Sequence, residues 1–107
     1  MSHHNFQLDK LSRFSTHLEE LCSMFQSSQH DDASAELADE IAATAGEIML
    51  LLADHGEDEL VRVTLDAARR LREVARTLQP RREQLVAVGA ALTSDVALII
   101  HAEKRAA

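Results

Sequence analysis

The residues with the clearest potential for chemistry are carboxylates in the first half of the chain. Asp39, Glu40 and Glu47 follow Glu36 after three, four and eleven residues. In a helix these spacings bring side chains onto adjoining faces, and carboxylate oxygens are the ligands that Mg²⁺ and Ca²⁺ prefer. The pattern would allow one helix to hold a divalent cation, as in a metal-dependent enzyme or a sensor.

The Glu36-x-x-Asp39 pair resembles one half of the acidic site in the all-helical, magnesium-dependent nucleotide pyrophosphohydrolases. Those enzymes supply Glu-x-x-Glu from one helix and Glu-x-x-Asp from the next, so the resemblance implies that Glu36 and Asp39 would play the second part. The chain departs from the pattern, because no Glu-x-x-Glu precedes Glu36 and the following segment offers arginines instead. We therefore expect no catalytic residues, no metal site and no cofactor.

Other catalytic arrangements also fail on inspection. The residues three before His17, His30, His55 and His101 are not glutamates, which excludes the paired Glu-x-x-His of a ferritin-type di-iron bundle. The single cysteine, Cys22, excludes a zinc cluster of several cysteines. Cys22 also lies beside the apolar stripe of the first predicted helix, where we expect a buried and unreactive thiol.

Charge is segregated along the chain. Residues 31–60 contain ten acidic residues and no Lys or Arg, whereas residues 69–82 contain six arginines and one glutamate. If two antiparallel helices are joined by a turn near residue 56, residues at equal distances from the turn lie side by side. Arg72 then faces Glu40, and Arg76 faces Glu36. Charged faces of this kind support helix pairing or bind a partner. The arginines predicted to form a partner-binding surface are Arg69, Arg72, Arg76, Arg81 and Arg82.

The period of the apolar residues predicts an all-α fold in a single domain, residues 1–107, with residues 1–4 disordered. The predicted helices span about 5–27, 34–54, 57–79 and 80–104, in an antiparallel four-helix bundle or as paired helical hairpins. Gly56 is expected to end the second helix in a left-handed conformation. Because Pro80 follows Gln79 directly, the last two helices are alternatively one long kinked helix.

The segment from Gln84 to Ser94 is uncharged, and its apolar residues surround most of the last predicted helix. An ordinary surface helix needs only one apolar stripe. We therefore expect either a central position in the bundle or a homodimer through this helix. Gly46, inside the second helix, costs about 1 kcal/mol relative to Ala, which indicates a packing reason for it.

Net charge and composition limit the partners. A formal net charge of −7 argues against nucleic acids and anionic membranes, and the unbroken apolar runs 48–53 and 96–100 are far shorter than the roughly 20 residues of a membrane span. The single cysteine and the absence of a secretory pattern favour the cytoplasm, and the Ala and Arg content suggests a bacterial source. We expect a small interaction protein without catalysis, such as an adaptor, chaperone or regulatory binder with a protein partner. The alternatives are a divalent-metal enzyme or small-ligand sensor using the carboxylates of the second helix, and a helix-turn-helix nucleic-acid binder using Arg81 and Arg82.

Overall fold

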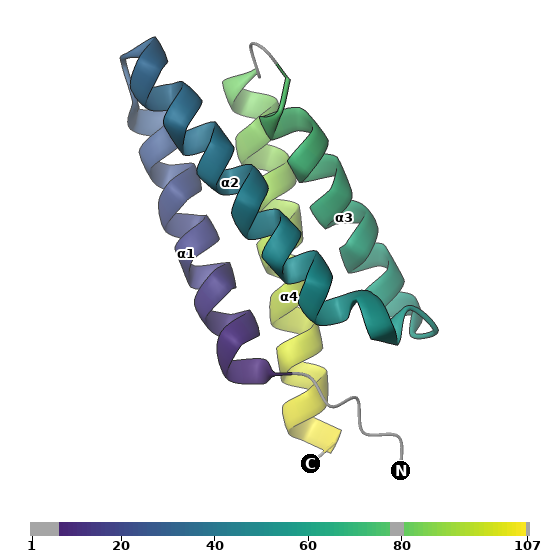
Figure 1. Ribbon diagram of the computed structural model, residues 1–107. Coiled ribbons are helices and arrows are strands. Elements are labelled where there is room, and N and C mark those ends of the chain that lie inside the picture. The colour runs from purple at the N-terminus through teal and green to yellow at the C-terminus, as the bar shows by residue number, and fades with distance from the viewer. Residues whose placement is uncertain (1–6, 78–80, 107) are drawn as a thin grey trace.

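The computed structural model describes residues 7–77 and 81–106, and these residues form an antiparallel bundle of four helices (Figure 1). The helices are α1 (Leu8–Ser27), α2 (Asp31–Leu52), α3 (Glu59–Ala75) and α4 (Arg82–Ala106). Each helix packs against two others, in the pairs α1 with α2, α2 with α3, α3 with α4, and α4 with α1. The prediction of an all-α helical bundle is confirmed.

One apolar stripe from each helix forms the core. Its large side chains, all fully buried, are Leu11, Leu18, Ile41, Ile48, Leu52, Val61, Leu71, Leu85, Leu92 and Val96. Two threonines share this interior, and each hydroxyl donates a hydrogen bond of 2.8 Å to a backbone carbonyl one turn earlier, Thr44 to Glu40 and Thr64 to Leu60. These bonds satisfy polar groups that would otherwise be costly to bury.

The turn between α2 and α3 differs from the prediction. Helix α2 continues into a 3₁₀ turn, Ala53–His55, and Gly56 has a φ of −68°, so the predicted left-handed conformation is wrong. Helix α3 begins at Glu59 rather than at 57, because the Asp58 carboxylate accepts hydrogen bonds from the backbone amides of Leu60 and Val61 at 2.9 and 3.4 Å. A side chain that satisfies the free amides fixes the start of a helix.

The connection between α3 and α4 excludes one long kinked helix. Helix α3 ends at Ala75, α4 begins at Arg82, and the two helices pack against each other. At the end of α3 the amide of Arg76 donates to the carbonyl of Arg72 at 3.1 Å. Residues 78–80, and with them the Gln79-Pro80 step of the prediction, lie outside the described residues, as do residues 1–6.

Helix α4 is not central, because it buries one face and exposes the other. Leu85, Leu92, Val96 and Ile99 lie inside the bundle, whereas Leu98 is 54% exposed. Other residues of the outer face are small, namely Ala87, Ala90, Ala91, Ser94 and Ala97. By length and composition alone α4 could cross a membrane, with a mean hydropathy of 1.9 and 28% of its most apolar window buried. One such helix is weak support for a membrane span, because buried core helices pass the same test.

Candidate docking groove between α2 and α3

Three of the five arginines predicted to bind a partner lie along one open groove between α2 and α3, which has a volume of about 580 Å³. Arg69, Arg72 and Arg76 are separated by three and four residues, so they share one side of α3. The rest of the lining is mostly small or apolar: Ala42, Ala43, Gly46, Met49, Leu50, Ala53 and Leu65, with Glu47. The groove therefore combines an apolar floor with a basic rim.

Leu50 is the most exposed large apolar side chain in the described part of the chain. It is 72% exposed, whereas its neighbour Leu52 is fully buried. Gly46 and Ala43, both small, line the groove with it. An exposed leucine next to arginines is a common feature of protein-binding surfaces, where an apolar contact is surrounded by polar ones.

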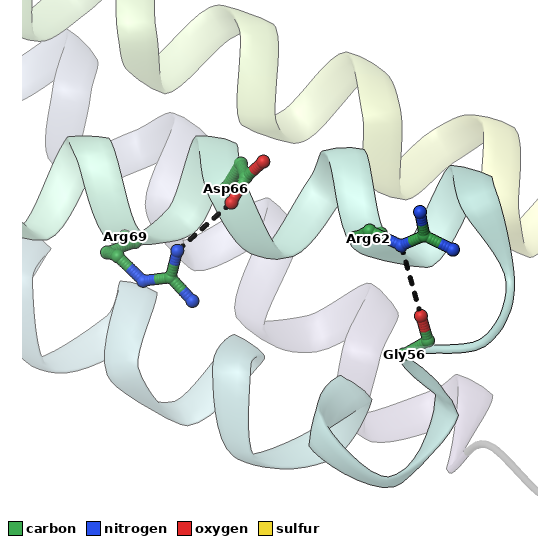
Figure 2. Close-up of polar contacts among 4 residues, drawn as sticks. All are labelled: Gly56, Arg62, Asp66 and Arg69. Carbon is green, nitrogen blue, oxygen red and sulfur yellow. Dashed lines mark hydrogen bonds and ion pairs between the residues drawn. The ribbon is translucent and has the colours of Figure 1, made fainter.

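The positive charge of this rim is only weakly compensated. Arg69 forms an ion pair with Asp66, one turn earlier on α3, at 3.0 Å (Figure 2). Because both side chains are about 60% exposed, the pair contributes only about 0 to 1 kcal/mol. In the described residues, no ion pair or hydrogen bond involves the side chains of Arg72 and Arg76. Glu47 is the acidic residue that lines the same groove.

The predicted pairs Arg72–Glu40 and Arg76–Glu36 are wrong. Glu36 and Glu40 line a different groove, of about 420 Å³, beside Met24 of α1. At 100° per residue they lie on the side of α2 that faces α1, away from α3. Side chains also lean toward the N-terminus of their own helix, so side chains at one height on antiparallel neighbours lean in opposite directions.

The same carboxylates do not assemble a metal site. Glu36, Asp39 and Glu40 are all exposed. Among residues 7–77 and 81–106, no group of three or more His, Cys, Asp or Glu side chains is placed to hold a metal ion. The geometry therefore gives no support to a cation bound along α2.

The other two predicted arginines, Arg81 and Arg82, lie at the start of α4 and not in the groove. The Arg82 guanidinium lies 5.7 Å from the centroid of the Phe25 ring, and this cation–π contact offsets the unfavourable position of a cation at a helix N-terminus. Phe25 of α1 therefore compensates for the position of Arg82.

Cys22 lies in the contact between α1 and α4. It is 8% exposed, and burial raises the pKa of its thiol to about 11, so the buried thiol was correctly predicted. A Cβ atom added at Gly89 would lie 2.7 Å from the Cys22 sulfur. Gly89 therefore allows α4 to approach α1 closely.

Gly46 has no equivalent role within the chain. A Cβ atom added there would meet no atom within 4 Å. The predicted packing reason is therefore not found inside the bundle. Gly46 instead lies in the lining of the α2–α3 groove, where the missing side chain leaves space on the outside of the molecule.

Comparisons of the chain with protein-family models, with curated proteins and with solved structures gave no match. The remaining exposed large apolar residues, Met24, Val63 and Leu98, lie on three different helices. In the described part of the chain, the α2–α3 groove brings an exposed leucine, three arginines and several small residues together.

Proposed function

We propose that the protein is a non-catalytic interaction protein, acting as an adaptor, chaperone or regulatory binder, and that it holds another protein in the α2–α3 groove. The observation that carries the proposal is Leu50, 72% exposed beside the arginine-lined side of α3. Fully burying a leucine side chain stabilises a complex by about 1.5 to 3 kcal/mol. Arginines at the edge of such a contact are frequent contributors to binding.

The shape of the groove favours a protein over a small molecule. It is open to solvent along its length and bordered by two helices, α2 and α3. Small-molecule sites are concave and bury most of the ligand surface, whereas an open groove between helices suits an added helix. The exposed carboxylates of α2 and the net charge of −7 give less support to a metal-dependent enzyme and to a nucleic-acid binder. The single cysteine remains the basis for proposing a cytoplasmic location.

Site-specific photo-crosslinking in cells tests this proposal. A photoreactive residue replaces Ala43, which is exposed in the groove, and the control replaces Thr16, exposed on α1. We expect a discrete protein adduct at position 43 only, and its loss when Leu50→Glu or Arg72→Glu is added. Helical circular dichroism verifies that each variant folds. Equal labelling at both positions, or an adduct insensitive to both substitutions, would contradict a binding role for the groove.

A further inference from the structure

The α2–α3 face has opposite charges on its two sides. The α3 side presents Arg69, Arg72 and Arg76. On α2, Glu47 lines the same groove, and the exposed Asp39 lies four residues before Ala43, on the same side of the helix. Since these groups make no ion pairs with the arginines inside the described chain, the charge on each side is available to a partner. A partner that fits would carry the same two charged rows in the opposite arrangement.

We propose that the occupant of the α2–α3 groove is a second copy of this chain, related by a twofold axis that runs along the bundle. The proposal rests on the interaction role proposed above and names the partner. A rotation of 180° about such an axis places α3 of each copy over α2 of the other. The arginine row then meets the partner's carboxylate row, and the same contact occurs twice, as twofold symmetry requires.

Heights along the bundle match in this arrangement. The α2–α3 hairpin turns near Gly56, so residues 69–76 of α3 lie level with about residues 36–43 of α2. Rotation about an axis parallel to the helices keeps these heights. Arginine side chains on α3 lean toward the turn, and glutamates on α2 lean away from it. Arg72 thus approaches the partner's Glu47, and Arg76 approaches the partner's Asp39.

The apolar part of the groove is also complementary to itself. Leu50 lies level with about residue 62 of α3 and leans away from the turn, which brings it to the partner's Leu65. Arginine stems of the partner would lie over Ala43 and Gly46, because long side chains cover apolar surface with their methylene groups. This contact would fill the space beside Gly46, where an added Cβ atom would meet no atom of its own chain within 4 Å.

Solution mass of the purified full chain, measured by light scattering over a wide range of concentration, tests the inference. The chain has a mass of 11.8 kDa, so the wild type should approach twice that value. Arg72→Glu with Arg76→Glu should be monomeric, and so should Asp39→Arg with Glu47→Arg. Like charges brought together across an interface are strongly unfavourable, so each pair should raise the dimer dissociation constant by about 100-fold or more. Mixing the two variants should restore a dimer that contains one chain of each, as native mass spectrometry would detect.

The matched control is Leu98→Glu, on the outer face of α4 where the sequence predicted the dimer. We expect this variant to remain dimeric. If the wild type is monomeric at every concentration, the inference is overturned. The groove still stands as a binding site for another protein if the photo-crosslinked adduct at position 43 is observed. A different result would place the interface on α4: Leu98→Glu breaks the dimer, and the arginine reversals leave it intact. That result also overturns the inference. If a charge reversal does not fold, Leu50→Glu replaces it as the variant expected to be monomeric.

Discussion

Replacing Gly89 by alanine tests the contact between α1 and α4 most directly. An added Cβ atom would lie 2.7 Å from the Cys22 sulfur, whereas the next nearest atoms, Cβ of Cys22 and Cδ1 of Leu71, would lie at 3.9 and 4.0 Å. Only the sulfur is too close, since the other two distances are ordinary van der Waals contacts. Either the thiol must rotate or the two helices must separate.

The free-energy change combines two opposing effects. Forcing an extra methyl group into a packed contact costs about 1 to 3 kcal/mol. Alanine in place of glycine within a helix gains about 1 kcal/mol. We therefore expect Gly89→Ala to lower the free energy of unfolding by about 0 to 2 kcal/mol, and the same substitution in a Cys22→Ala background to raise it. The coupling between the two positions should be about 1 to 3 kcal/mol, which is the overpacking cost itself.

Urea unfolding followed by helical circular dichroism measures this coupling from the wild type, the two single variants and the double variant. All four chains are compared at one protein concentration, because self-association would make stability depend on concentration. Gly46→Ala, made in the monomeric Arg72→Glu, Arg76→Glu background, is the matched control, since its added methyl group meets nothing within 4 Å in its own chain, and it should gain up to about 1 kcal/mol. Additive effects of the two substitutions, within about 0.5 kcal/mol, would refute the steric argument.

Three further predictions concern single side chains. Asp58→Ala should lower the free energy of unfolding by about 0.5 to 2 kcal/mol, because it leaves two amides of α3 without their acceptor, while Asp58→Ser should retain most of the stability in the same urea assay. Arg82→Ala should cost about 0.5 to 1 kcal/mol through loss of the contact with Phe25, whereas Arg81→Ala should cost close to nothing; equal effects would contradict a specific cation–π contact. Burial that raises the Cys22 pKa to about 11 should make alkylation by iodoacetamide slow, and a Ser23→Cys chain with Cys22→Ala should react faster at the same pH. Because the folded protein favours the neutral thiol, this group's contribution to stability is present below pH 9.0 and is lost as the pH rises toward 11, which urea unfolding across that range would measure.

The helices and their antiparallel order were predictable because the apolar stripes set them. Leu11 and Leu18, for example, are seven residues apart, which is two helical turns, and both are fully buried. Helix ends were less predictable, since they depend on local hydrogen bonds that hydrophobic periodicity does not contain. Asp58 decided where α3 begins. The 3₁₀ turn before Gly56 kept that glycine in right-handed geometry.

The basic side of the groove could be predicted from spacing, but its apolar centre could not. Arg69, Arg72 and Arg76 share one side of any helix, whatever its rotation. The run Met49–Leu52 contains four consecutive apolar residues, and which of them points outward depends on the rotation of α2 within the bundle. A difference of two positions separates a buried Leu52 from a 72% exposed Leu50. Only tertiary packing fixes that rotation.

The mistaken charge pairs explain why this surface remains available. Matching residues by their distance from the turn assumes that side chains extend straight across from one helix to the other. Side chains instead lean toward their own N-terminus, so residues at one height on α2 and α3 diverge. The rotation of α2 also turns Glu36 and Glu40 toward α1. The charge segregation of the sequence is therefore not neutralised by ion pairs between α2 and α3 of one chain, and in the dimer proposed above the partner's Asp39 and Glu47 lie over the arginines of α3.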